Sequence, residues 1–412
     1  MNTIYGWLAE ANREQKRTLL AAALGWMLDS MDVMLYALVL GPIQREMHLS
    51  SAMSGAMMSV TLISAAVGGI AFGWFADRAG RVRALTASVL IYSIATALCG
   101  LTHSAPQLMA CRILLGLGMG GEWASGAALV AESWPARHRG KALALVQSSW
   151  AVGFALGAAL VAVILPRYGW RAVFFAGIAP ALIALWIQHS LHEPEAWRQQ
   201  RAPTFRPAQL FRGRLGTSTL ICATMNAATL FGWWGLFTWL PRFLSAPRSA
   251  GGRGLGIVTT SGWTIAMQAG AFLGYLTFGY LADAWNRKYA YIAFLVVAAA
   301  LVPLFAFVRN PTALFLIGPL VGFFGTGYFS GFTVIASELF PTALRASAMG
   351  FAYNIGRILS AIAPWAIGRI SESAGLAAAL CITSAAFLLA ALIATALRSP
   401  SAELVSETQL SS

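Results

Sequence analysis

Residues 73–83 read GWFADRAGRVR, and residues 279–288 read GYLADAWNRK. Both stretches follow an apolar run, and in both a glycine, an aspartate and an arginine stand four residues apart. The first copy supplies Gly73, Asp77 and Arg81, and the second supplies Gly279, Asp283 and Arg287. Each residue of the second copy lies 206 positions after its counterpart, which indicates that a long segment of the chain is duplicated.

A second pair of motifs has the same offset. Residues 132–142 read ESWPARHRGKA, and residues 338–348 read ELFPTALRASA. Three residue types match, at Glu132, Pro135 and Arg139 and again at Glu338, Pro341 and Arg345. Two separate motifs that share one offset of 206 residues predict a duplicated structural unit.

The composition is that of a membrane protein. Of the 412 residues, 58% are hydrophobic and 10% are charged, whereas about a quarter of the residues in a soluble domain are charged. A helix needs about 20 apolar residues to cross the hydrocarbon. Twelve such runs are present, at 18–40, 52–76, 84–103, 106–132, 141–165, 170–191, 217–243, 256–282, 290–308, 312–337, 347–369 and 375–397. We therefore expect an all-α membrane protein with twelve transmembrane helices, six in each copy of the repeat.

These runs divide the chain into two six-helix bundles, residues 1–191 and 217–397, joined by a polar linker at 192–216 and followed by a tail at 398–412. Because six is an even number of spans, both copies have the same orientation. Parallel repeats of this kind place a binding site between the halves near the middle of the membrane.

The net charge of +13 is an orientation signal, because cytoplasmic loops of membrane proteins carry an excess of Lys and Arg. With the N-terminus in the cytoplasm, 18 basic residues fall on that side and eight on the other. We expect both termini in the cytoplasm and no nucleic-acid partner. The four cysteines all lie in predicted spans without metal-ligand spacing, so we expect neither a disulfide nor a metal site.

Several stretches resemble one transporter family. The twelve spans, the duplicated loop motif, and RILLGLGMGGEW followed by ESWPARHRGKA and HEPEAW resemble the major facilitator superfamily over nearly the whole chain. LDSMDVMLY, GWRAVFFAGIAP and FAYNIGRILSAIAP resemble its proton-coupled symporters for sialate, lactate and pyruvate. The resemblance implies the major facilitator fold, alternating access, and a location in the plasma membrane, which in bacteria is the inner membrane.

Residues 112–126, RILLGLGMGGEWASG, contain the glycine spacing of a dinucleotide-binding loop. Such a loop needs a preceding strand and a soluble βαβ unit, and neither is predicted here. Small residues at every fourth position, Gly116, Gly120, Ala124 and Ala128, instead predict close packing of two membrane helices. We therefore expect no cofactor, and the proton gradient is the expected energy source.

Five charged residues lie well inside predicted spans: Asp29, Asp32, Arg112, Glu122 and Arg357. Charge inside the membrane is costly, so such residues are functional candidates. Asp32 and Arg112 are predicted at a similar depth, and an arginine changes the proton affinity of a neighbouring carboxyl group. A pair that forms and breaks would couple protons to transport, and the resemblance implies the same pair. A static ion pair is the alternative.

The other two acids are also assigned to proton coupling. Asp29 and Asp32 are three residues apart on one helix face. We expect the two carboxyl groups to share one proton or to take it up in sequence. The alternative is that Asp29 only forms a bond to a neighbouring helix. Glu122 is either a second proton site or a cytoplasmic gate residue.

Arg357 is predicted near mid-membrane, roughly 15 Å along its helix. Its span contains no acid, and a guanidinium suits a carboxylate, so we expect it to bind an anionic substrate. A bridge to Asp29 is the alternative. Further expected substrate residues are the amides Asn354, Asn226 and Gln147 and the aromatic residues Trp123 and Tyr328, with Trp233 and Trp234 beside them.

The repeated loop motifs predict a cytoplasmic gate. Its expected residues are Gly73, Asp77, Arg81, Glu132, Arg139, Gly279, Asp283, Arg287, Glu338 and Arg345. In the second copy, Trp285 and Asn286 replace Ala79 and Gly80, which predicts a less flexible turn.

These observations predict a secondary transporter that imports a small organic anion, a monocarboxylate such as lactate, pyruvate or a sialate-like acid, together with protons. Transport of a neutral sugar, export in exchange for protons, and nutrient sensing are alternatives. No hydrolase motif is present, so we do not expect an enzyme. The lipid bilayer is the expected surrounding, and a monomer is the expected functional unit.

Overall fold

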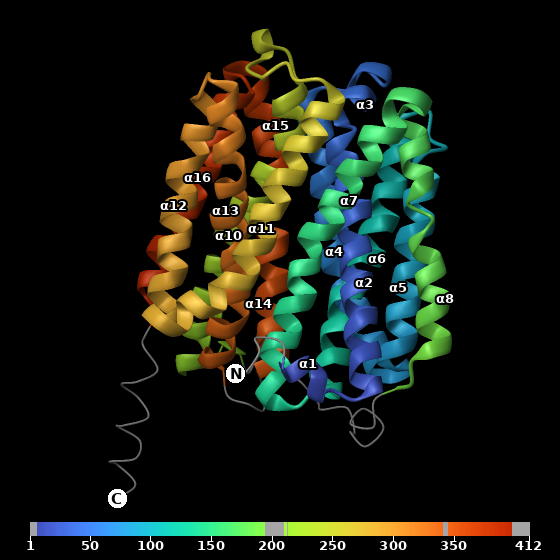
Figure 1. Cartoon of the computed structure of the whole chain (residues 1–412), viewed down its shortest axis with the longest axis vertical. Helices are drawn as coiled ribbons and strands as arrows, with labels where there is room; N and C mark the ends of the chain where they lie inside the picture. The colour runs from blue at the N-terminus through green and yellow to red at the C-terminus, as the bar shows by residue number, and fades with distance from the viewer. Residues whose placement is uncertain (1–5, 194–209, 212, 341–344, 398–412) are drawn as a thin grey trace, which may run out of the picture.

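The computed structural model describes residues 6–193, 210, 211, 213–340 and 345–397, and within them it contains helices and no strand. The long helices run along one direction and form a bundle (Figure 1). The first half contains α1 (Gly6–Glu10), α2 (Arg13–Leu38), α3 (Leu40–Glu46), α4 (Ser51–Ala79), α5 (Arg81–Cys99), α6 (Ala105–Ser133), α7 (Ala136–Ala176) and α8 (Pro180–Ser190). The second half contains α10 (Gly213–Ser245), η2 (Arg248–Ala250), α11 (Ile257–Trp285), α12 (Arg287–Phe307), α13 (Pro311–Leu339), α14 (Arg345–Ser360), α15 (Ile362–Ala374) and α16 (Leu376–Thr395). Most of the predicted linker and the whole predicted tail lie outside the described residues.

Helix bounds repeat with the offset that the motifs share. Helices α4 and α11 each have 29 residues and begin 206 positions apart. Helices α6 and α13 also have 29 residues each and begin 206 positions apart. The duplication inferred from two loop motifs is therefore confirmed over whole helices, and the fold consists of two repeats.

The turns between helices repeat as well. Gly80 joins α4 to α5 with φ 111°, and Asn286 joins α11 to α12 with φ 102°. Gly169 and Gly375, another pair at the same offset, have φ 77° and 80°. Positive φ is unfavourable for a residue with a Cβ, and the Asn286 side chain accepts a hydrogen bond from the backbone N–H of Lys288 (3.0 Å). The second turn thus has the shape of the first, although its residue is not glycine.

Ten helices in the described part of the chain are long and apolar enough to cross a membrane, whereas twelve spans were predicted. The predicted spans 141–165 and 170–191 lie in one apolar stretch, His138–Ala184, although the backbone kinks at Gly169, whose φ of 77° and ψ of 176° are not helical. The predicted span 347–369 divides at Ala361 into α14 and α15, which are 16 and 13 residues long.

Proline explains two of these helix ends. A proline ring clashes with the carbonyl group four residues earlier and kinks or ends the helix there. Helix α14 ends at Ser360, four residues before Pro364, and α7 ends at Ala176, four residues before Pro180. The boundaries therefore follow from backbone chemistry that hydropathy alone does not report.

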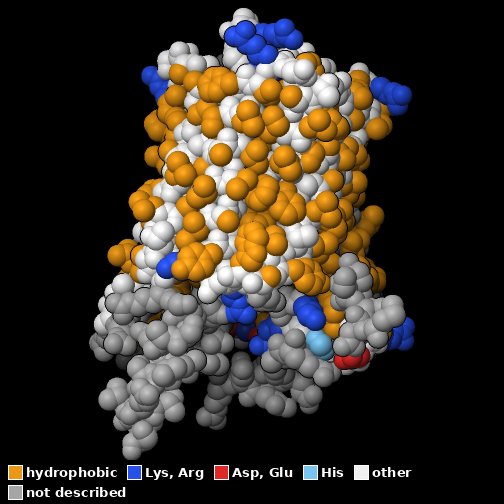
Figure 2. Space-filling model, turned by 60° about the vertical axis from the view of Figure 1, so that its left-hand side comes forward, with side chains coloured by type: hydrophobic (Ala, Val, Ile, Leu, Met, Phe, Trp, Pro, Cys, Tyr) orange, Lys and Arg blue, Asp and Glu red, His pale blue; other side chains and the backbone are white. Residues whose placement is uncertain are grey.

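The sides of the bundle are hydrophobic. Figure 2 shows hydrophobic side chains over the middle of one face, with Lys and Arg gathered near the two ends. Large apolar side chains such as Ile70, Leu182 and Leu392 are 63–69% exposed. An apolar belt between charged ends is the surface that a bilayer covers.

The two halves meet closely at the end of the bundle that carries α3, called here the α3 end, which is the upper end in Figure 1. A Cβ added to Gly55 would overlap the carbonyl oxygen of Pro364, and one added to Gly368 would overlap that of Ser51. The backbones of α4 and α15 are therefore in direct contact.

Polar contacts join the halves at the same end. The Glu372 carboxylate accepts a hydrogen bond from the backbone N–H of Ala52 (2.9 Å), and Arg242 Nε donates to Gln44 (2.8 Å). The Ala52 N–H and the Arg369 guanidinium hold the pKa of Glu372 below its usual value. The α3 end is thus closed by both backbone packing and hydrogen bonds.

We expect Gly368→Val to force α15 away from α4 and to lower the thermal unfolding midpoint of the purified protein. The cost of such overpacking is about 1–3 kcal/mol. Gly262→Val is the matched control, because a Cβ at Gly262 meets nothing within 4 Å. Equal midpoints for the two variants would contradict the close contact between the halves.

Candidate functional site

Three of the predicted proton-coupling residues lie near one tyrosine. Asp29 and Asp32 of α2 and Glu122 of α6 are at most 1% exposed, and all three interact electrostatically with Tyr92 of α5. The Tyr92 hydroxyl donates to the carbonyl oxygen of Gly25 (3.3 Å). Within the described residues, neither carboxyl oxygen of Asp29 or Asp32 has a hydrogen-bond donor. The interior of the first half therefore holds three carboxyl groups with unused hydrogen-bonding capacity.

The predicted pair of Asp32 and Arg112 is not in direct contact among the residues described. Arg112 Nε donates to Thr61 Oγ1 (3.1 Å), and its guanidinium lies over the Tyr36 ring, 4.7 Å from the centroid. Arg112 Nη1 and both Asp32 oxygens have no described hydrogen-bond partner, yet the two side chains interact electrostatically. The structure therefore contains the separated form of the predicted pair.

Arg357 of α14 is 2% exposed and lines a cavity between the halves. Its Nη2 donates to the Tyr353 hydroxyl (3.3 Å), whereas its Nε has no described acceptor. Asp29 interacts with Arg357 electrostatically, but neither of its oxygens accepts a hydrogen bond. The bridge to Asp29, considered as the alternative role of Arg357, is therefore not formed in this conformation.

Aromatic side chains make up most of the cavity wall. The first half supplies Trp26, Met119, Gln147 and Trp150, and the second half supplies Leu230, Trp233, Trp234, Tyr275, Phe329, Tyr353 and Arg357. The ring centroids of Trp26 and Trp150 are 4.7 Å apart, and those of Trp150 and Trp233 are 5.7 Å apart. The cavity volume is about 20 Å³, which is room for about one water molecule. The rings thus nearly close the cavity.

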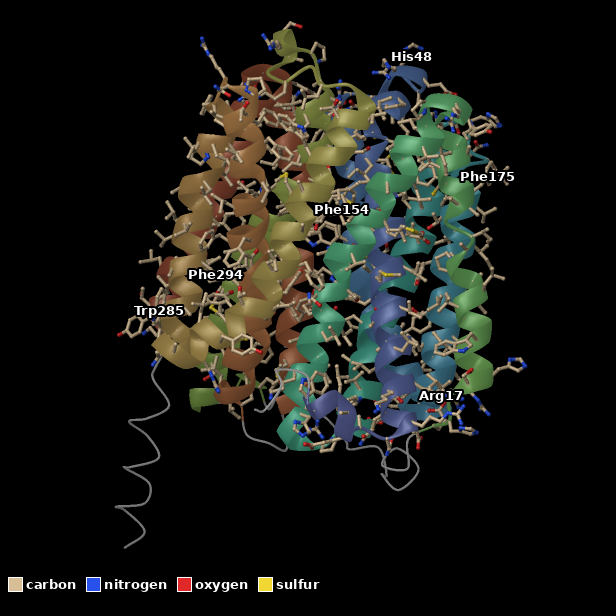
Figure 3. All side chains as sticks on the ribbon, viewed as in Figure 1. Arg17, His48, Phe154, Phe175, Trp285 and Phe294 are labelled. Atoms are coloured by element: carbon tan, nitrogen blue, oxygen red, sulfur yellow. The ribbon has the colours of Figure 1, made fainter. Side chains whose placement is uncertain are left out.

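The aromatic contact between the halves continues beyond the cavity. One turn along α7 from Trp150, Phe154 packs against Phe237 of α10 with centroids 6.4 Å apart. Figure 3 shows Phe154 in the interior of the bundle, between α7 and the second half. Apolar rings therefore separate the cavity from the α3 end.

Four of the predicted substrate-site residues line this cavity. Arg357, Gln147, Trp233 and Trp234 all belong to its wall. The side chain of Gln147 also lies beside that of Tyr275 across the interface between the halves.

The two other predicted amides lie away from the wall. Asn226 Nδ2 donates to the carbonyl oxygen of Tyr353 (3.1 Å) and so ties α10 to the helix that carries Arg357. Asn354 faces Gly69 of α4, because it projects from α14 in a different direction from Arg357. These amides position α14 and do not line the cavity.

Two predicted aromatic residues are not part of the wall but pack against residues that are. Trp123 packs against Trp26 with centroids 4.6 Å apart, and Tyr328 packs against Phe329 at 4.7 Å. The Tyr328 hydroxyl donates to the carbonyl oxygen of Thr229 (3.2 Å). Their packing supports the rings that do reach the cavity.

Sequence reasoning missed Trp26, Trp150, Tyr353 and Tyr92 as site residues. A helical signal was present for three of them, since Trp26 precedes Asp29 by three residues, Trp150 follows Gln147 by three, and Tyr353 precedes Arg357 by four. Side chains three or four residues apart share a helix face. Tyr92 has no such neighbour, and only the packing of α5 against α2 and α6 identifies it.

The first copy of the predicted gate forms a connected network at the other end of the bundle. Arg81 binds Asp77 (2.6 Å) and Glu132 (3.0 Å), and so links the start of α5 to α4 and α6. Arg139 Nη2 contacts the carbonyl oxygen of Trp134 (3.5 Å). These contacts bring together residues from both sequence motifs.

Packing does not require glycine at the two repeated gate positions. A Cβ on Gly73 or Gly279 would meet nothing within 4 Å. Arg287 begins α12, and the side chains of Asp283, Glu338 and Arg345 lie outside the described residues. The second copy of the gate therefore stays a prediction.

The glycines of residues 112–126 form a packing interface, as predicted. A Cβ on Gly116 would overlap the carbonyl oxygen of Thr61, and one on Gly120 would overlap that of Ala65. Helix α6 thus lies against the backbone of α4 at both positions, and this stretch is the interior of a long helix.

Comparison with known proteins identifies the family. Residues 22–257 and 252–410 match the sequence profile of the Major Facilitator Superfamily. The chain belongs to this superfamily. The fold agrees: the crystal structure of a D-xylose-proton symporter superimposes with a TM-score of 0.77, covering 94% of this chain and 99% of that one at 18% identity.

Two curated relatives are similar over most of their length. A probable 4-methylmuconolactone transporter of Cupriavidus pinatubonensis is 35% identical over 400 residues, covering 93% of this chain and 91% of that protein. A sialic acid transporter of Escherichia coli is 29% identical over 390 residues, covering 92% and 93%. The resemblance to superfamily transporters of organic acids is confirmed. So is the expectation that the chain is not an enzyme.

Membership in the superfamily also settles the location. A major facilitator protein with many apolar helices is an integral, multi-pass membrane protein. Its bacterial relatives indicate the inner membrane.

The contacts of Arg81 lead to a stability prediction. In a double-mutant cycle, Arg81→Ala and Glu132→Gln should show a coupling of about 1–2 kcal/mol, because the two side chains touch and are largely buried. The measurement is thermal unfolding of both single variants and the double variant. Arg83→Ala, which changes an exposed neighbour, should show no coupling to Glu132→Gln. Additive effects of Arg81→Ala and Glu132→Gln would contradict the network.

Proposed function

We propose that this chain is a secondary active transporter that imports a small organic anion, a monocarboxylate, together with protons by alternating access. The observation that carries the proposal is Arg357, a buried cation in a cavity between the halves whose Nε lacks an acceptor among the described residues. A buried guanidinium needs an anion, and a carboxylate matches its fork of donors. The named substrates of the two relatives support an organic acid.

Proton coupling is assigned to the acids of the first half. Asp29, Asp32 and Glu122 are buried near one another, and Asp29 interacts electrostatically with Arg357. An arginine stabilises the ionised form of a nearby carboxyl group. A substrate anion bound to Arg357 would weaken the interaction between Arg357 and Asp29. The contact between Asp32 and Arg112 would form and break in the same cycle. Binding of the anion and binding of the proton are then linked, with the proton gradient as the energy source.

The topology completes the proposal. We assign one membrane span to α14 together with α15, and two spans to the apolar stretch around Gly169, which gives twelve spans with both termini in the cytoplasm. The α3 end is then extracellular. Because packing and hydrogen bonds close that end, the conformation described is one from which substrate would leave toward the cytoplasm. One chain contains both halves and suffices as the transport unit.

Arg357→Ala should weaken binding of an anionic substrate about 10- to 100-fold, the loss expected for a charge-assisted hydrogen-bonded pair. Binding of labelled organic acids to the purified protein measures this change. Arg369→Ala is the control, because Arg369 lies at the α3 end, where it pairs with Glu372 (2.9 Å). Wild-type affinity in Arg357→Ala would exclude Arg357 as the anion site.

Asp32→Asn should retain exchange of substrate across proteoliposomes and lose accumulation driven by a pH gradient. An amide keeps the shape of the side chain but carries no proton through the cycle. Glu46→Gln removes an acid that binds Trp170 Nε1 at the α3 end (2.6 Å), and it should accumulate substrate normally. Normal accumulation by Asp32→Asn would exclude Asp32 as the proton carrier.

A further inference from the structure

Two tryptophans that line the cavity have an indole N–H without an acceptor among the described residues. Trp26 Nε1 and Trp150 Nε1 are buried and have no described partner, and both tryptophans line the cavity from the first half. Arg357, with its unpartnered Nε, lines it from the second half. A buried N–H group without an acceptor costs free energy, so a ligand that supplies acceptors at both walls would gain from each.

A third indole at the same cavity differs in this respect. Trp233 Nε1 donates to Thr326 Oγ1 (3.4 Å), so its N–H already has an acceptor inside the second half. The ring of Trp233 packs on Trp150 (5.7 Å), and both rings are in the wall. Trp150 and Trp233 thus offer similar ring surface to a ligand, whereas only Trp150 has a free donor.

The shape of the cavity limits the skeleton of the ligand. The volume is about 20 Å³ because tryptophan, tyrosine and phenylalanine rings from both halves lie against one another. A flat conjugated ligand that inserts between these rings would stack on them. Each ring-to-ring contact that is lost is then replaced by a contact between the ring and the ligand. A saturated skeleton is thicker and has no π face to offer.

The remaining polar groups of the wall do not suit a polyhydroxylated ligand. The Tyr353 hydroxyl accepts from Arg357, and Gln147 lies beside Tyr275. A sugar-like ligand would compete with the bond between Arg357 and Tyr353 and bury several hydroxyl groups against indole rings. Buried hydroxyl groups without partners are unfavourable.

We propose that the substrate is a flat, conjugated carboxylate that carries a second hydrogen-bond acceptor away from the carboxylate, and that the indole N–H groups of Trp26 and Trp150 select this acceptor. The carboxylate binds Arg357, and a ring nitrogen or an oxygen at the other end of the skeleton accepts from the indoles. The inference rests on the proposed function, because it takes Arg357 as the carboxylate site.

Three kinds of probe separate the parts of this proposal. Nicotinate and isonicotinate have the flat ring of benzoate with one ring nitrogen as the added acceptor, at two different positions. Cyclohexanecarboxylate keeps the size and the carboxylate but is saturated. Binding is measured by calorimetry on the purified full-length chain in nanodiscs at neutral pH. We expect the better of the two pyridine acids to bind about 5- to 10-fold more tightly than benzoate, the gain from one buried hydrogen bond. Benzoate should in turn bind more tightly than cyclohexanecarboxylate.

Phenylalanine variants test the two donors. Trp26→Phe and Trp150→Phe keep an aromatic ring but remove the N–H, so at least one of them should reduce the preference, measured as the ratio of the affinities for the pyridine acid and benzoate, to about twofold or less. Trp233→Phe is the matched control and should keep the full preference. The wild-type comparison of the probes needs no variant and tests the proposal by itself.

Three results would overturn the inference. The first is that wild-type protein binds benzoate and both pyridine acids with equal affinity. The second is that Trp26→Phe and Trp150→Phe both keep the wild-type preference for the pyridine acid. The third is that wild-type protein binds cyclohexanecarboxylate and benzoate with equal affinity. If any of these occurs while Arg357→Ala still weakens binding as expected above, the inference fails and the proposed function stands. If binding of all probes is independent of Arg357, both fail.

Discussion

Direct contact between helix backbones at small residues is the constraint on which this bundle depends. Lipid tails are as apolar as the helix surfaces, so membrane helices associate through close packing and not through the hydrophobic effect. Gly116 and Gly120 bring α6 onto the backbone of α4, and Gly322, 206 positions after Gly116, brings α13 onto α11. Gly55 and Gly368 make the same kind of contact between the halves. Contacts within each half hold it together, and the proposed alternating access requires the contact between the halves to break.

The duplication repeats this scaffold but not the charges. The positions equivalent to Asp29, Asp32, Arg112 and Glu122 in the second half are Gly235, Thr238, Gly318 and Tyr328, and the position equivalent to Arg357 in the first half is Ala151. Three buried acids therefore lie in one half, and the cation at the cavity lies in the other. The two bundles thus contain different buried charges, and in the proposed mechanism the link between proton and anion passes through the interface between them.

Residues that reach the cavity were only partly predictable. Arg357 and Gln147 were identified because a buried charge or amide needs a partner, and both line the wall. Asn354 does not line the cavity in this conformation and faces Gly69 of α4, and Tyr328 packs against Phe329, which does line it. Residue type signals that a side chain needs a partner. The rotation of the helix decides which partner it meets.

Hydropathy, motif spacing and charge by themselves determined that this chain is a helical membrane protein, that its second half repeats its first, and which charged residues are buried. These are properties of one helix at a time or of the order of residues, and they do not depend on how helices cross. Only the tertiary structure decided that Asp32 and Arg112 stand apart, that aromatic rings nearly close the cavity, and that two indole N–H groups lack acceptors within the described part of the chain. Each of these depends on the rotation and crossing of several helices at once, which packing sets and no single segment encodes.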